Sequence, residues 1–209
     1  MSRQLIAVLL MVSASSSAWA DAPGETPPVA VTAKAPETID VGDREVGVQL
    51  GVASGAHTTP GGLRIAGHFL YQMSDSDWFE ALAAVTYGSS AAGCFRDRGD
   101  AYVCQHGLAD GFSVDLGVGL RRFFEAQRGF RPYARLAVAA RVLRFGDDRV
   151  SGFAIPVIAG AGVRVRVSDS LAVGGEGAVE VGPGWLGRGV GTQLERGLTV
   201  GAFAEVALP

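Results

Sequence analysis

The chain has 209 residues, of which 18 are Lys or Arg and 21 are Asp or Glu, so its formal net charge is −3. This balance argues against a nucleic-acid-binding protein, because it offers no excess of positive charge for phosphates. Hydrophobic residues make up 48% of the chain and 30 residues are glycine, yet no apolar run approaches the roughly 20 residues of a spanning helix. Together these features predict an all-β protein with one apolar face.

The first 44 residues carry the features of an exported chain. Arg3 precedes an apolar run over residues 5–12, and Ala18-Trp19-Ala20 is a cleavage motif, so residues 1–20 are predicted to be a signal peptide. The run is too short for a membrane anchor. Residues 21–44 are rich in Pro, Ala, Thr and acidic residues. They are expected to form a disordered periplasmic leader or, alternatively, a tether to another component.

From residue 45 onward, apolar residues recur at every second position, which is typical of strands with one apolar face. The hairpin over residues 155–181 shows this pattern best, with small apolar residues on one face and glycine and charges of both signs on the other. Ser168-Asp169-Ser170 breaks it in the middle. The same alternation predicts eight strands, over residues 45–54, 63–73, 78–87, 111–123, 130–143, 155–167, 171–181 and 198–208.

The connections between these strands alternate in length, as periplasmic turns and external loops do in membrane barrels. Short connections are expected near residues 74–77, 125–129 and 168–170, and longer ones near 55–62, 88–110, 146–152 and 182–197. Strands of about 10 residues are long enough to cross a bilayer at a tilt. The pattern therefore predicts that residues 45–209 form an all-β, eight-stranded antiparallel up-and-down transmembrane β-barrel.

The polar face of the strands is expected to line the barrel interior, which eight strands leave just wide enough for side chains to fill. The charged residues predicted to point inward are Glu80, Asp115, Arg121, Arg135, Arg141, Arg164, Arg166, Glu176, Glu180 and Glu205. Buried charges of this kind must pair and form hydrogen bonds. We expect them to form a polar plug, and an ion path or gated pore is the alternative.

Aromatic residues gather near the ends of the predicted strands, which favours girdles at the two membrane interfaces. Those near the short connections are Tyr71, Trp78, Phe79, Phe123, Phe124, Phe130 and Tyr133. Those near the long connections are Tyr87, Phe112, Phe145, Phe153 and Trp185.

Cys94 and Cys104 are the two cysteines of the chain and both lie in the connection over residues 88–110. In an exported chain this predicts a disulfide, which would contribute roughly 2–3 kcal/mol by loop-entropy arithmetic. A metal site is a weak alternative, because only His106 lies nearby.

The sequence contains no strong signal for catalysis. A hydrolase or acyltransferase acting on lipid A would need a nucleophile or base with an acidic partner near the outer rim. His57 and His106 are predicted in loops, His68 is predicted to face inward, and no Gly-x-Ser-x-Gly motif is present. We therefore expect no enzyme activity and no cofactor.

Residues 160–172 (GAGVRVRVSDSLA) resemble the late hairpin of small outer-membrane β-barrel proteins of the OmpA/OmpX type. In that family a Gly-x-Gly strand leads through a Ser-Asp turn to a strand that ends in an acidic residue, a place that Glu176 or Glu180 would take. Arg131-Pro132-Tyr133 is similar to the start of a middle strand in the same family. The chain departs from the family at its last residues, Val206-Ala207-Leu208-Pro209, where members usually finish in an aromatic residue.

The resemblance implies an eight-stranded barrel in the outer membrane of a Gram-negative bacterium, without implying one activity. The first hypothesis is a structural or surface-interaction protein that displays loops 88–110 and 182–197 to an external partner. The alternatives are a small-solute channel and a soluble, lipocalin-like periplasmic lipid binder with its apolar face inward. For a membrane barrel, the expected partners are outer-membrane lipid, lipopolysaccharide and the barrel assembly machinery.

Overall fold

The computed structural model describes residues 42–56, 60–89, 93–96, 101–105, 110–127, 129–145, 150–186 and 192–209. The expected signal peptide, most of the expected leader, His57 and His106 lie outside these residues. Among the residues that are described, no helix is long and apolar enough to cross a membrane.

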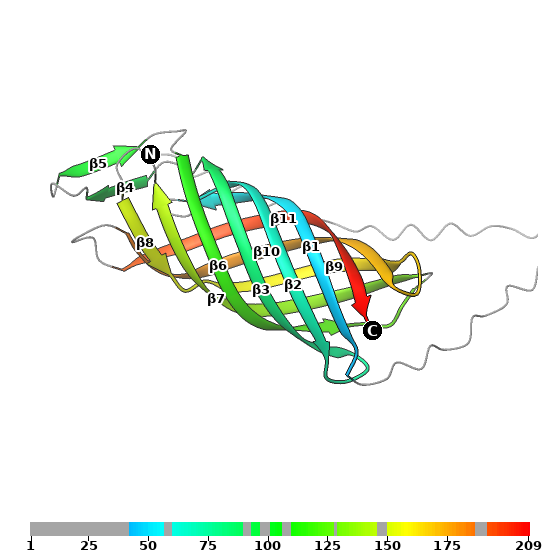
Figure 1. Ribbon diagram of the computed structural model, residues 1–209. Helices are drawn as coiled ribbons and strands as arrows, with labels where there is room; N and C mark the ends of the chain where they lie inside the picture. Colours follow the sequence, from blue (N-terminus) through cyan, green and yellow to red (C-terminus); the bar gives the residue numbers. More distant parts are fainter. Residues whose placement is uncertain are drawn as a thin grey trace, which may run out of the picture. The chain divides into compact units, whose positions relative to one another are not determined.

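The described chain is built from β-strands. They are β1 (Arg44–Ala56), β2 (Gly62–Gln72), β3 (Asp77–Ser89), β4 (Gly93–Arg96), β5 (Tyr102–Gln105), β6 (Asp110–Phe123), β7 (Phe130–Phe145), β8 (Val150–Ala154), β9 (Val157–Arg166), β10 (Leu171–Leu186) and β11 (Gln193–Leu208). All but β4 and β5 belong to one antiparallel sheet, in which neighbours in sequence are neighbours in space. The sheet closes on itself because β1 pairs with β11, so that it has no free edge (Figure 1).

Strands β8 and β9 are two segments of one barrel strand. On β10, Ala154 pairs with Gly184 and Val157 pairs with Val181, so the register continues unchanged across the interruption. Pro156 interrupts the ladder because proline has no N–H to donate. The nine segments of the sheet therefore form eight barrel strands, and the predicted eight-stranded up-and-down fold is confirmed.

The three predicted short turns join β2 to β3, β6 to β7 and β9 to β10 at one rim, here called the short-turn end. In the first of them, the N–H of Asp77 donates to Ser74 Oγ at 3.0 Å and the N–H of Met73 donates to the Asp77 carbonyl at 2.9 Å. In the last, the N–H of Leu171 donates to Ser168 Oγ at 3.1 Å. The opposite rim, here called the loop end, carries the longer connections (Figure 1).

The loop end differs from the prediction in strand length. Most of the expected loop over residues 182–197 is strand, because β10 continues to Leu186 and β11 begins at Gln193. Gly184 was interpreted as a loop residue, but it pairs with Gln193 on β11, and an added Cβ there would meet Glu195 Cγ at 2.6 Å. The glycine makes room inside the barrel. The expected loop over residues 146–152 is also shorter, since β8 begins at Val150.

Candidate functional site

The interior of the barrel gathers the charged residues of the chain. Along each strand, side chains alternate between the interior and the outer surface, as period-2 geometry requires. Asp115 is fully buried, for example, whereas Leu116 is 63% exposed. The structure places nine of the ten predicted interior charges inside the barrel: Glu80, Asp115, Arg121, Arg135, Arg141, Arg164, Glu176, Glu180 and Glu205.

Arg166 differs from the prediction. It points to the interior side but its side chain is 37% exposed, because it is the last residue of β9 and lies at the short-turn end. Its Nη2 contacts Glu45 Oε1 at 3.4 Å. Arg166 therefore belongs to the rim of the barrel and is not enclosed.

Toward the loop end, Arg141 is the centre of a group that we call the loop-side cluster. Its guanidinium donates to both carboxylate oxygens of Asp115 at 2.7 and 2.9 Å. It donates to both oxygens of Glu180 at 2.7 Å, and Glu195 Oε2 lies 3.8 Å from it. Arg64 completes the cluster through Asp115 at 2.7 Å. Two bidentate contacts on one guanidinium hold it firmly, since the planar fork of arginine matches a carboxylate.

Toward the short-turn end, a second group of charges forms the turn-side cluster. Its members are Glu45, His68, Glu80, Arg121, Arg135, Arg164, Glu176 and Glu205. Glu80 is the hub, because its Oε1 lies 2.6 Å from His68 Nδ1, 2.8 Å from Arg121 Nη2 and 3.2 Å from Arg135 Nη1.

The rest of the turn-side cluster extends from this hub to the rim. Arg121 also contacts Glu205 and Arg135 contacts Glu176 at 3.2 Å. Arg164 bridges Glu205 at 3.4 Å and Glu45 at 2.6 Å. The result is a chain of alternating charge that runs across β3, β6, β7, β9, β10, β11 and β1.

An aromatic layer packs against the turn-side cluster. It consists of Leu70, Trp78, Phe123, Tyr133 and Phe203, which are all buried. Tyr133 is central, since its hydroxyl donates to Glu176 at 2.8 Å and the Arg121 guanidinium lies 4.6 Å from its ring centroid. Arg121 thus has a cation–π contact in addition to its carboxylate partners.

The aromatic layer corrects part of the predicted girdle. Trp78, Phe123 and Tyr133 were expected at the membrane interface, but they are only 2% exposed and face inward. The reason is that side chains alternate along a strand: each of the three lies two residues from an interior charge on the same strand and therefore shares its face. Exposed aromatics at the short-turn end are Tyr71, Phe124 and Phe130.

At the loop end, the outward aromatics include Tyr87, Phe112, Phe153 and Trp185. Phe153 and Trp185 stack at 6.1 Å between ring centroids. The side chain of Phe145 lies outside the described part.

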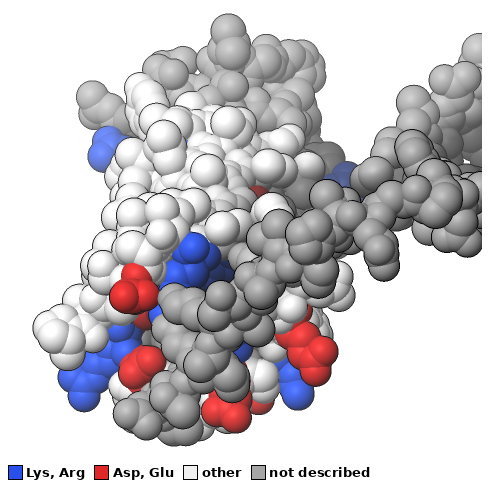
Figure 2. Space-filling view, turned by 90° about the vertical axis from the view of Figure 1, so that its right-hand side faces the viewer, with Lys and Arg blue, Asp and Glu red and all other residues white. Residues whose placement is uncertain are grey.

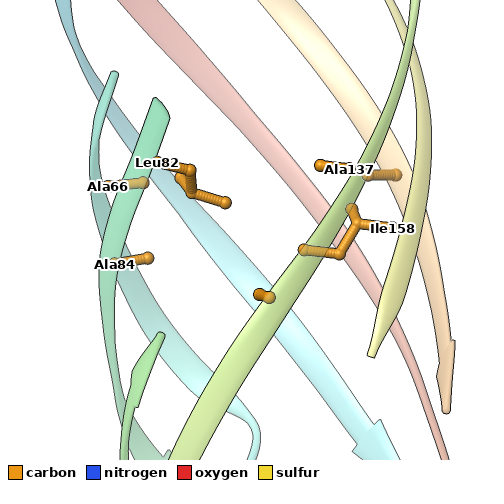
Figure 3. Close-up of a cluster of buried hydrophobic side chains, with 7 residues drawn as sticks. Ala66, Leu82, Ala84, Ala137 and Ile158 are labelled. Carbon is orange, nitrogen blue, oxygen red and sulfur yellow. The ribbon is translucent and has the colours of Figure 1, made fainter. Parts of the chain in front are cut away.

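A layer of small apolar residues separates the two charge clusters. It is formed by Ala66, Leu82, Ala84, Ala137, Ala139, Ile158 and Ala178, all less than 6% exposed. On β7, Ala137 and Ala139 lie between Arg135 of one cluster and Arg141 of the other. Figure 3 shows these side chains pointing into the barrel from opposite walls. The side chains of this layer form no hydrogen bond or ion pair, so the layer separates the two clusters in space.

Sequence reasoning missed four buried charged or titratable members of the clusters: Glu45, Arg64, His68 and Glu195. Arg64 and His68 were placed on the inward face of the second strand, so their direction was predicted but their part in the charge clusters was not. Glu45 stands at the start of β1 and was left out. Glu195 was hidden by the assignment of residues 182–197 to a loop. Glu195 is separated from Thr199 and Glu205 by an even number of residues, and this spacing would have assigned it to the inward face of the last strand.

Charge in the interior is nearly balanced. Seven buried carboxylates (Glu45, Glu80, Asp115, Glu176, Glu180, Glu195 and Glu205) face five buried arginines and, at the rim, Arg166. Such pairing is necessary because an unpaired charge in this environment is strongly destabilising. In the described part of the chain, no group of three or more His, Cys, Asp and Glu residues could hold a metal ion.

Cys94 and Cys104 lie in the small β4–β5 hairpin between β3 and β6. The register of the two strands pairs these residues directly across from each other. The backbone arrangement is compatible with the predicted disulfide, which stays a prediction because the side chains of these strands lie outside the described part.

The outer surface of the barrel is an apolar band. Val52, Leu116, Leu136 and Val200 are each 58–65% exposed, and many other valines and leucines share this face. Figure 2 shows the surface from the side of the short-turn end: charged residues gather at the lower end, and the surface above is mostly uncharged. The barrel therefore has its polarity inverted relative to a water-soluble protein.

No family model matches the chain, and no curated protein matches it in sequence. Among solved structures, Neisserial surface protein A (NspA) is similar over 78% of this chain and 96% of its own, with 14% identity and a TM-score of 0.58. Ail, the attachment invasion locus protein of Yersinia pestis, covers 80% of this chain and 99% of its own at 12% identity and a TM-score of 0.46. A de novo designed transmembrane β-barrel covers 80% of this chain and 98% of its own at 17% identity and a TM-score of 0.40.

The likeness to NspA concerns the fold. It agrees with the strand order and closure described above, and the chain has the fold of a transmembrane β-barrel.

Proposed function

We propose that this chain is an integral outer-membrane protein with a structural or surface-interaction role. The observation that carries the proposal is the inverted polarity of the barrel: charges fill the interior and the outer surface is a continuous apolar band. A monomeric soluble protein rarely exposes an apolar patch of more than a few hundred Å². The hydrocarbon core of a bilayer is the environment that such a band requires.

The lipocalin-like alternative requires the opposite arrangement. A barrel that binds an apolar ligand inside would point Val48, Leu50 and Val52 inward, yet these side chains are 56–65% exposed. Buried Glu80 and Asp115 would then face water. The observed polarity favours the membrane barrel.

We propose that the two charge clusters, together with the aromatic layer, close the interior. Arg121 on β6 reaches Glu205 on β11, on the opposite side of the barrel, and Arg141 on β7 bridges Asp115 on β6 and Glu180 on β10. A closed barrel leaves the loop end as its functional surface, which includes the β4–β5 hairpin and the ends of β10 and β11. NspA, the structure with the same fold, is named as a surface protein.

We propose further that the barrel is inserted by the assembly machinery after export through a cleaved signal peptide, and that its lipid partners include lipopolysaccharide. No catalytic role is proposed. The histidine–carboxylate pair of His68 and Glu80 is buried, and Glu80 is already engaged by Arg121 and Arg135, so it is not poised to act on a substrate.

The membrane proposal predicts heat-modifiable gel mobility. Outer-membrane and periplasmic fractions are compared on detergent gels with and without boiling. We expect the protein in the outer-membrane fraction, with a faster band in the unboiled sample, because a closed sheet resists detergent until heated. A soluble protein in the periplasmic fraction with a single mobility would contradict the proposal.

The closed interior predicts an absence of steady conductance. The purified chain is incorporated into planar bilayers, with gramicidin added at the end of each record to show that the bilayer can report a pore. We expect no sustained current from the chain itself, because paired side chains occupy the lumen. Ohmic, ion-selective conductance in proportion to incorporated protein would favour the small-solute channel instead.

A further inference from the structure

The apolar band ends in arginine at the loop end. On β7 the outward residues Leu136, Val138, Ala140 and Val142 are followed by Arg144, which is exposed. On β11, Arg196 holds a similar outward place between Leu194 and Leu198. A guanidinium on the lipid-facing side is unfavourable in hydrocarbon and is tolerated near the interface. These positions mark the level at which polar head groups begin.

The neighbours of Arg144 add a second polar group and an aromatic wall. Its register partners are Ser151 on β8 and Phe112 on β6, and both are exposed on the same outward face. The pair of guanidinium and hydroxyl is suited to a phosphate, because arginine offers a planar fork of donors and serine one more.

Closer to the membrane centre, an apolar groove of about 830 Å³ crosses the same strands. Its lining includes the outward residues Phe69, Ala83, Leu116, Ala140, Phe153 and Ile155. Alanine at positions 83 and 140 leaves depth between larger neighbours. Ala140 is four residues from Arg144 along β7, or about 13 Å at roughly 3.3 Å per residue. A head group held at Arg144 therefore directs its acyl chains along β7 into the groove.

We propose that Arg144 and Ser151 bind a phosphate of lipid A, with acyl chains of the same molecule in the groove below. This inference rests on the proposed outer-membrane function, which places the loop end in the outer leaflet. The phosphorylated lipid of that leaflet is lipopolysaccharide, whose lipid A carries several acyl chains on one phosphorylated glycan. A wide groove that spans several strands fits such a lipid better than a two-chain phospholipid.

The test measures the affinity of the refolded full chain for hexa-acylated lipid A in detergent micelles by native mass spectrometry. The variants are Arg144→Ala, which removes the phosphate donor, and Ala140→Leu, which fills the groove. Matched controls are Arg122→Ala, an arginine that is exposed at the short-turn end, and Ala204→Leu, an outward alanine on β11. Phosphatidylglycerol and dephosphorylated lipid A are the comparison lipids.

We expect Arg144→Ala and Ala140→Leu each to weaken lipid A binding about tenfold, the effect of losing roughly one charged hydrogen bond or good apolar contact. The controls should stay within about twofold of the wild-type value. Dephosphorylated lipid A should bind the wild type as weakly as lipid A binds Arg144→Ala.

Equal binding by Arg144→Ala and the wild type would overturn the site. Equally tight binding of phosphatidylglycerol, sensitive to the same variants, would overturn the assignment to lipid A. Gel mobility is measured on every sample: a wild-type chain that shows the heat shift but does not bind lipid A counts against this site alone. A wild-type chain without any heat shift counts against the outer-membrane function.

Discussion

Replacement of Arg141 with methionine is expected to lower the free energy of unfolding by about 3–5 kcal/mol. Arg141 neutralises Asp115 and Glu180 through four short contacts, and Glu195 lies nearby. Without the guanidinium, these buried carboxylates keep only Arg64 as a cationic neighbour in the loop-side cluster. The measurement is equilibrium urea unfolding of the refolded barrel in detergent, followed by tryptophan fluorescence.

The matched control for this variant is Arg122→Met. The Arg122 side chain is 65% exposed and lies 3.7 Å from Asp77, which is itself 41% exposed. Exposed ion pairs contribute less than about 1 kcal/mol, so this variant should unfold close to the wild type. Adding Glu180→Gln to Arg141→Met should recover part of the loss, because that orphaned carboxylate is then neutral while Asp115 keeps its ion pair with Arg64. Equal stabilities of Arg141→Met and Arg122→Met would contradict the role given to the loop-side cluster.

The second large effect is expected from Gly162→Ala. Gly162 of β9 lies opposite Tyr133 of β7, and the tyrosine ring covers the position that a side chain would take. An added Cβ would stand 2.5 Å from both Cζ and the hydroxyl oxygen of Tyr133. The ring must therefore move, which disturbs its hydrogen bond to Glu176 and its contact with Arg121. We expect the free energy of unfolding to fall by about 3 kcal/mol, since overpacking alone costs about 1–3 kcal/mol.

Gly177→Ala provides the control for this prediction. Gly177 belongs to the neighbouring strand β10, and an added Cβ there would meet no atom within 4 Å. It should be neutral or slightly stabilising, because alanine reduces the freedom of the unfolded chain. The same unfolding experiment compares the two variants. Near-identical unfolding midpoints would contradict the predicted cost of the added Cβ.

Much of the fold was predictable because strand geometry is local. Alternation of side chains is a property of the extended backbone itself, so reading every second residue assigned Glu80, Asp115 and Arg141 to one side and Leu116 to the other. Short polar breaks such as Ser74–Asp77 predicted turns, because side chains of these residue types form hydrogen bonds with the nearby backbone. Closure into an eight-stranded barrel then followed from strand number and the alternation of connection lengths.

Strand ends were less predictable. At the loop end, pairing with a neighbouring strand keeps residues in the sheet, and the local sequence pattern does not show this pairing. Glycines at positions 182 and 184 are typical of a loop, yet pairing with β11 keeps them in the sheet. Pro156 is typical of a strand end, yet the register continues across it. In both places, hydrogen bonds to a neighbouring strand outweigh the preference of the individual residue.

The sequence by itself determined the face of the charged residues within the predicted strands, such as Glu80, Asp115 and Arg141, and how many strands the barrel has. Only the tertiary structure decided the partners on strands that are not neighbours: Arg141 meets Glu180 from 39 residues away, Arg121 meets Glu205 from 84, and Arg164 meets Glu45 from 119. It also decided that a layer of mostly alanine residues separates the charges into two clusters. The physical reason is that alternation depends on the geometry of one extended strand, whereas contacts across the lumen depend on the relative stagger of all strands in the closed barrel.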